Sequence, residues 1–201
     1  YALEQDAFKD ENAAEKYLFD EINKVYSIYI SVLYALKEVI HYSIEDLEIT
    51  KSKFIFKEEH KLSSDALFNN RISTCLVEHS DIENLMKKEK VRFSIDTKLT
   101  KDIFNELKFS EEYKAYLEMG EHTKKDELFI IEYLFLDCLI SNENFHQLME
   151  DNWLSWEEDQ TFIVKLILKT LERASNKPRK SQLISKNGNY WEEEKEFVKT
   201  L

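Results

Sequence analysis

The chain has 201 residues, of which 43% are hydrophobic and 34% charged, and its formal net charge is −12. Such a surface repels polyanions, because affinity for nucleic acids comes largely from Lys and Arg that neutralise phosphates, so the segment by itself is a poor candidate for binding RNA, DNA or an anionic membrane. Two Gly and one Pro leave few residues for tight turns and strand bulges. This scarcity predicts an all-α fold, an irregular multi-helix bundle.

A long helix is predicted near the start of the chain. Apolar residues recur at spacings of three and four from Leu18 to Ile40, which indicates a helix of about eight turns. The pattern weakens near Tyr42. We therefore expect a bend or break there, followed by a shorter helix over residues 43–56.

Four shorter helices are expected next, over residues 67–77, 81–86, 101–107 and 111–119. Ser80, Thr100 and Ser110 are the expected N-caps of the last three, because a short hydroxyl side chain can accept from a free backbone N–H of the first turn. Gly120 stands where a helix end often takes a left-handed residue.

The most apolar helix is expected over residues 126–140, so it should lie at the centre of the fold. Thr123 and Asp126 have the spacing of a capping box in front of it. Two further helices follow, with Ser141 and Ser155 as the expected N-caps. The stretch 176–190, which holds the one Pro, is the predicted linker or exposed loop.

The two cysteines, Cys75 and Cys138, lie far apart among apolar neighbours. They have no framework spacing, which favours a reducing, cytoplasmic setting. The longest apolar stretch, 128–140, contains Glu132 and Asp137 and is too short to span a bilayer.

The sharpest enzyme hypothesis is a carboxylate-bridged di-metal centre between four helices. Its ligands would be two Glu-x-x-His pairs and two further glutamates: Glu38 with His41, Glu143 with His146, Glu21 and Glu132. Glutamate is so frequent in this chain that such pairs are expected by chance. The sequence therefore predicts no metal site, no catalytic residue and no cofactor.

Histidines and tryptophans are the remaining side chains that could have a role in binding. His60, His79 and His122 fall in expected loops and are predicted to be solvated. Trp153, Trp156 and Trp191 precede or begin helices, and we expect them to anchor those helices on the bundle. The alternative, a platform on which bases stack, is disfavoured by the acidic residues that follow Trp156 and Trp191.

Several short motifs follow one another in an order that carries a family resemblance. They are Tyr1-Ala2-Leu3, the I-x-K-x-Y pattern at 22–26, Asn69-Asn70-Arg71, and the runs 109–118, 139–159, 162–174 and 191–201. Together they resemble the long form of the transcription antitermination factor NusB. The resemblance covers nearly the whole chain, although the Arg-rich N-terminal segment and the C-terminal helical half of that family find no match.

The resemblance implies an all-helical protein that binds the boxA element of ribosomal RNA transcripts together with the ribosomal protein NusE. It implies action on the RNA polymerase complex against termination, without enzymatic activity. No RNA-contacting position of the family falls on a residue of this chain, so RNA-binding residues stay unassigned.

The resemblance also suggests a domain division. Residues 1–175 would be a lineage-specific helical domain that serves as a scaffold or interaction region, and 191–201 would be the truncated start of the C-terminal domain. The alternative hypothesis is a helical protein-interaction domain unrelated to transcription, and the di-metal helical-bundle enzyme is the third.

Overall fold

The computed structural model describes residues 11–53, 58–77 and 81–176, and within these ranges it contains helices and connecting loops but no strand. The all-α prediction is therefore confirmed. The elements in chain order are α2 (Glu11–Lys51), η1 (Glu58–Leu62), α3 (Arg71–Val77), α4 (Ile82–Lys88), α5 (Thr97–Phe109), α6 (Glu111–Glu118), α7 (Lys124–Tyr133), η2 (Leu134–Ile140), α8 (Glu143–Asn152) and α9 (Trp156–Asn176).

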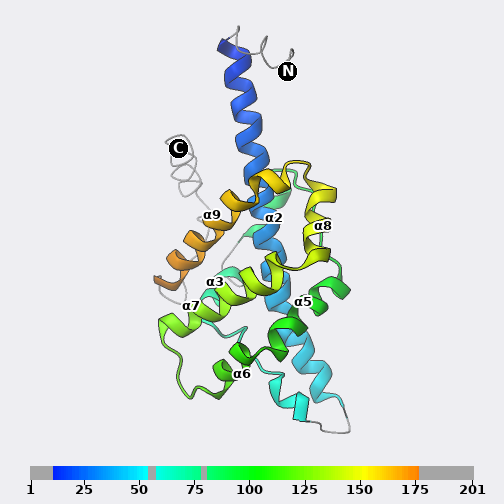
Figure 1. The fold of residues 1–201 in the computed structure, drawn as a ribbon, viewed down its shortest axis with the longest axis vertical. Coiled ribbons are helices and arrows are strands. Elements are labelled where there is room, and N and C mark those ends of the chain that lie inside the picture. The colour runs from blue at the N-terminus through cyan, green and yellow to red at the C-terminus, as the bar shows by residue number, and fades with distance from the viewer. Residues whose placement is uncertain (1–10, 54–57, 78–80, 177–201) are drawn as a thin grey trace.

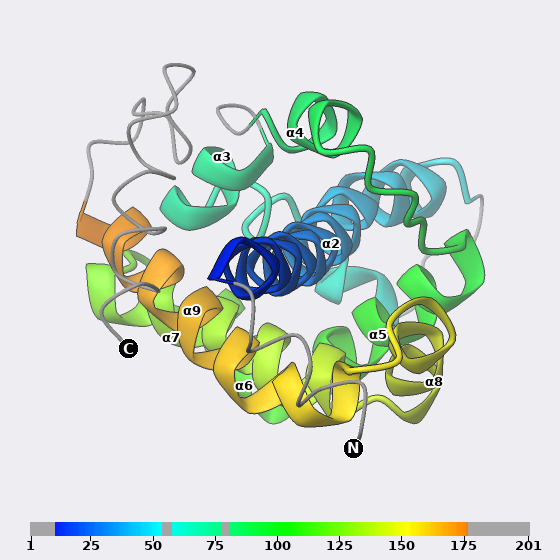
Figure 2. The ribbon, with the colours of Figure 1, turned by 90° about the horizontal axis from the view of Figure 1, so that it is seen from above.

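The 41-residue helix α2 is the axis of the molecule. Viewed along its length it lies in the middle of the other helices (Figure 2), and it contacts α3, α4, α5 and α9. Its central turns are buried on several sides, including Ile28, Leu33 and Leu36, none of which is exposed. Its N-terminal turns rise above the body of the fold (Figure 1), and there Tyr17 and Phe19 are exposed.

The sequence predicts a bend or break near Tyr42, with a separate helix over residues 43–56. The break and the separate helix are wrong, because α2 continues without interruption to Lys51. Tyr42 is buried and packs edge-to-face on Phe104 of α5, with ring centroids 5.7 Å apart. The hydroxyl of Ser43 donates to the carbonyl of Ile40 at 2.7 Å, so this polar side chain is satisfied inside the helix. Packing against α5 thus holds together a segment whose own sequence pattern is weak.

Two of the predicted N-caps are confirmed. The Ser110 hydroxyl accepts from the backbone N–H of Tyr113 at 3.1 Å, and Thr123 forms the predicted capping box with Asp126. Two others are wrong, one by four residues and one by a single residue. Helix α5 begins at Thr97 and is capped by Asp96, which places Thr100 inside the helix, and α8 is capped by Asn142 in place of Ser141.

The remaining predicted helix ends also differ. Helix α4 has Asp81 at its N-cap position, while Ser80 lies outside the described residues. Ser155 directly precedes α9, but its hydroxyl has no hydrogen-bond partner and does not cap. Gly120 is not left-handed; among the described residues the non-glycine with positive φ is Lys90, at 56°.

The apolar helix predicted over residues 126–140 is present, but its helix type changes along its length. It is α-helical as α7 and becomes a π-helix as η2, with Leu134, Phe135, Cys138 and Leu139 buried. The wider turn is visible at its end, where the backbone N–H of Ser141 donates to the carbonyl of Leu136, five residues earlier, at 3.2 Å.

Helix α9 closes one side of the bundle against α2 and α7. The predicted linker at 176–190 and the helix expected over 191–201 lie outside the described residues, apart from Asn176, which ends α9. Within the described ranges, no helix combines the length and the hydrophobicity that crossing a bilayer requires.

Candidate functional site

Both histidines considered as metal ligands lie near a glutamate of their own helix. His41 Nδ1 lies 3.8 Å from Glu45 Oε1, and His146 Nδ1 lies 3.3 Å from Glu150 Oε1. In the described part of the chain, no three or more His, Cys, Asp and Glu side chains gather as a metal site would require. The other four ligands considered are glutamates. Glu21 lies near Lys24 and Glu38 near Lys37. Burial and the charge of Glu172 raise the pKa of Glu132, and Glu143 is the exposed first residue of α8.

The cysteines and tryptophans belong to the core. Cys75 and Cys138 are buried free thiols, and burial raises the pKa of Cys138 to about 12, so this thiol stays protonated at neutral pH. Trp156 is fully buried and Trp153 packs against the same core, which confirms them as anchors, while Trp191 lies outside the described residues.

The prediction that His122 is solvated is wrong in part, because the residue is partly buried. Its ring stacks on that of Tyr116 with centroids 3.9 Å apart, and its Nδ1 atom is buried without a hydrogen-bond partner. His60 lies in η1 and is partly buried, and His79 falls outside the described residues. The sequence could not foresee the stacking, because Tyr116 comes from the preceding helix, α6.

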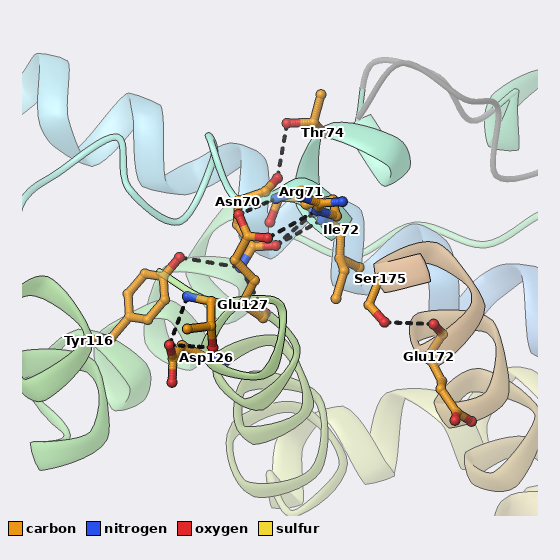
Figure 3. A network of polar contacts seen from close by, with 11 residues as sticks. Asn70, Arg71, Ile72, Thr74, Tyr116, Asp126, Glu127, Glu172 and Ser175 are labelled. Atoms are coloured by element: carbon orange, nitrogen blue, oxygen red, sulfur yellow. Dashed lines mark hydrogen bonds and ion pairs between the residues drawn. The ribbon is translucent and has the colours of Figure 1, made fainter. Parts of the chain in front are cut away.

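A buried polar junction ties α3 to α7 and α6 (Figure 3). The side-chain oxygen of Asn70 accepts from the backbone N–H of Ile72 at 2.8 Å, which caps α3. The amide nitrogen of Asn70 donates to the backbone carbonyl of Glu127 at 2.8 Å and to the Tyr116 hydroxyl at 3.3 Å. One side chain thus starts a helix and joins it to two others.

Glu127 is the charged centre of this polar junction, and it is only 3% exposed. Its carboxylate accepts from the backbone N–H of Arg71 at 3.3 Å and from Arg71 Nε at 3.2 Å. A buried carboxylate is costly unless it is paired and hydrogen-bonded, and Arg71 meets both needs. Asn70 and Arg71 are two of the residues that carry the family resemblance.

A second buried polar cluster lies between α2, η1 and α5. Lys108 Nζ donates to Asp46 Oδ2 at 2.7 Å and to Ser63 Oγ at 2.8 Å, and the Ser63 hydroxyl donates to the same Asp46 oxygen at 2.6 Å. A Ser–Lys nucleophile needs an amine that is free to take the serine proton. Here the amine donates to Asp46, and Lys108 and Ser63 are both buried, so we interpret the cluster as structural.

A groove lies where α4 ends beside α2. It has a volume of about 470 Å³, and its apolar surface comes from Tyr34, Met86, Val91 and Phe93. Three exposed cations line it: Lys87, Lys90 and Arg92. Two other hollows, of about 330 Å³ each, are lined by several carboxylates, so this groove differs from them in charge.

The groove is shaped by the way α4 ends. The backbone N–H of Val91 donates to the carbonyl of Met86 at 2.8 Å, and that of Lys90 donates to Lys87 at 3.3 Å. This pair of bonds is the Schellman motif, which usually has Gly in the left-handed position. Lys90 occupies it instead, in a conformation that costs a non-glycine residue about 1 kcal/mol.

Sequence reasoning missed this groove because it weighed the charge of the whole chain. The available signal was local: Lys87, Lys88, Lys90 and Arg92 stand within six residues of an acidic chain.

Comparison of the chain with protein-family models, with curated proteins and with solved structures finds no match.

Proposed function

We propose that this chain is part of a NusB-type transcription antitermination factor, which binds boxA-type RNA together with the ribosomal protein NusE and acts on the RNA polymerase complex. In this proposal the described helices are a scaffold or protein-interaction region and have no enzymatic role.

The observation that carries the proposal is where the matching residues lie. Ile22 and Tyr26, from the I-x-K-x-Y pattern, are 8% and 4% exposed, and Asn70 and Trp156, from two later motifs, are 1% and 0% exposed. The matched runs also hold exposed residues, among them Phe109 and Leu154, so the support for the proposal comes from the matched positions in the core. Matches at buried positions are what a shared fold requires, because packing restricts which side chains fit there.

The charge of the chain is consistent with a scaffold. A net charge of −12 disfavours phosphate contacts along most of this surface. In the proposal, RNA affinity therefore depends on the partner and on segments beyond this one.

The test is binding of fluorescein-labelled boxA RNA, followed by anisotropy with and without NusE. We would compare the 201-residue chain with the complete product of its gene, and use a boxA sequence with scrambled bases as the matched control. The proposal expects the complete product with NusE to bind boxA more tightly than the scrambled RNA, with affinity falling steeply as salt rises. Equal binding of the two RNAs, or none, would contradict it.

A second candidate is a helical protein-interaction domain unrelated to transcription. The observation that favours it is a set of large apolar side chains that are exposed. They include Tyr17 and Phe19 on α2 and Phe129 on α7, which are 55%, 41% and 54% exposed. Apolar surface of this kind marks interaction sites when it is contiguous. This candidate would replace the first if the complete product failed to distinguish boxA from the scrambled RNA.

A further inference from the structure

We propose that the groove at the end of α4 binds an acidic peptide segment of a partner protein, with an aliphatic or aromatic side chain of that peptide seated on the apolar floor. The inference does not rest on the proposed function, because it uses only the shape, the lining and the charge of the groove.

The floor of the groove is built from three parts of the chain. Tyr34 comes from α2, Met86 from the last turn of α4, and Val91 and Phe93 from the extended segment that follows. The Schellman bonds bring Val91 back toward Met86, an apolar contact that commonly accompanies this motif. The floor is therefore held by backbone hydrogen bonds and does not depend on a ligand for its shape.

The charge of the rim selects the partner. Lys87, Lys90 and Arg92 contribute three positive charges. The one lining carboxylate, Glu83, forms an ion pair with the buried amine of Lys37, which also lies 3.5 Å from Glu38 Oε1. Glu83 is attracted by Lys37 from the α2 side and also by Lys87 of the rim. The three cations of the rim outnumber its one carboxylate, so the rim can still attract carboxylates of a ligand.

An acidic peptide fits the groove better than single-stranded RNA. RNA that binds without base pairing stacks its bases on exposed aromatic faces. Here the ring of Phe93 is buried and meets Tyr34 edge-to-face, at 6.5 Å and 88°. The net charge of −12 would also repel the rest of a polynucleotide, whereas a peptide can confine its few carboxylates to the rim.

The residue at position 90 supplies an independent argument. Glycine is the residue that fits a left-handed helix end without strain, yet the chain has Lys there, with φ of 56°. A lysine there carries a left-handed strain that glycine would avoid. The contribution of a cation to the rim of the groove would explain why lysine occupies this position. A variant at position 90 tests this, because its effects on stability and on peptide binding can be measured separately.

The binding test uses a fluorescein-labelled, capped peptide in which glutamates flank a central Leu-Phe pair, titrated with the full chain and followed by anisotropy. The same peptide with a Gly-Gly centre tests the floor, and an oligouridylate of equal charge tests the polyanion alternative. We expect saturable binding of the Leu-Phe peptide and weaker binding of both controls. No saturation up to about 1 mM, or an oligouridylate that binds as well as the peptide, would overturn the proposal.

Variants then test the rim. Lys87→Glu and Arg92→Glu should each weaken peptide binding about five- to tenfold. Lys165→Glu, which makes the same charge change at an exposed position of α9, should change it less than twofold. Equal losses in all three variants would show a general charge effect and contradict a specific rim.

Lys90→Gly is the decisive variant. It should raise the melting temperature, because glycine relieves the left-handed strain, while it weakens peptide binding about two- to fivefold. A variant that is more stable and binds unchanged would show that Lys90 has no part in recognition. Since this variant is expected to gain stability, a loss of binding cannot be attributed to unfolding.

Discussion

The buried ion pair between Asp46 and Lys108 offers a sharp test of how this fold is held together. We consider Asp46→Ala, which removes the carboxylate and leaves the Lys108 ammonium without its charged partner. The side chain of Lys108 is 7% exposed and that of Asp46 is 15% exposed. Removing one partner of a buried pair costs about 3–5 kcal/mol, because the other charge stays buried. We expect about 3 kcal/mol, since Ser63 Oγ still accepts from the lysine.

The matched control is an ion pair of the same length at the surface. Lys114 Nζ and Glu111 Oε1 are also 2.7 Å apart, but their side chains are 37% and 87% exposed. Exposed pairs contribute about 0.2–1 kcal/mol, so Glu111→Ala should cost no more than about 1 kcal/mol. Equilibrium unfolding in urea, followed by circular dichroism, gives both free energies. Equal losses from the two substitutions would refute the argument from burial.

A double-mutant cycle extends the test. Lys108→Met keeps the apolar stem and removes the charge, and Asp46 still accepts from the Ser63 hydroxyl, so we expect about 1–2 kcal/mol. The double variant Asp46→Ala/Lys108→Met should cost about 2 kcal/mol less than the sum of the single ones, because no buried charge is left over. Additive losses would show that the two side chains do not act as a pair.

Three further predictions follow from buried groups. Glu127→Gln removes the charge that pairs with Arg71, and urea unfolding should show a loss of about 2 kcal/mol. Trp156→Ala empties a fully buried site and should cost about 3–5 kcal/mol by the same measurement. The pKa of Cys138 in the folded state, about 12, lies above that of an unfolded thiol. The unfolded state therefore loses its proton first, and the free energy of unfolding should fall as pH rises above about 9. Cys138→Ala should weaken this fall, and an identical pH profile would contradict the raised pKa of Cys138.

The sequence predicted the helical framework well where amphipathic periodicity and helix caps agree. Ser110 and the capping box at Thr123 illustrate this, because cap and helix start lie within three residues of each other. It failed at Tyr42, whose contact partner Phe104 lies about sixty residues further along the chain. It also failed at the choice between adjacent candidate caps such as Ser141 and Asn142, where local chemistry is nearly equal.

The polar sites were harder to foresee than the helices. Glu and Lys side chains usually face solvent, and nothing in the local sequence distinguishes the buried Glu127 and Lys108 from the other charged residues. The groove depends on Lys90 adopting a left-handed conformation, which no propensity rule predicts for lysine. Local clustering of cations in an acidic chain was the one signal present in the sequence.

The central position of α2 has a consequence for synthesis on the ribosome. The helix is made before α9, one of the helices that cover it, which begins at Trp156, about a hundred residues after Lys51. At about 5–20 residues per second, the apolar side of α2 facing α9 waits on the order of 5–20 s for its cover. We therefore expect the nascent chain to depend on chaperones that hold exposed apolar helices during this interval.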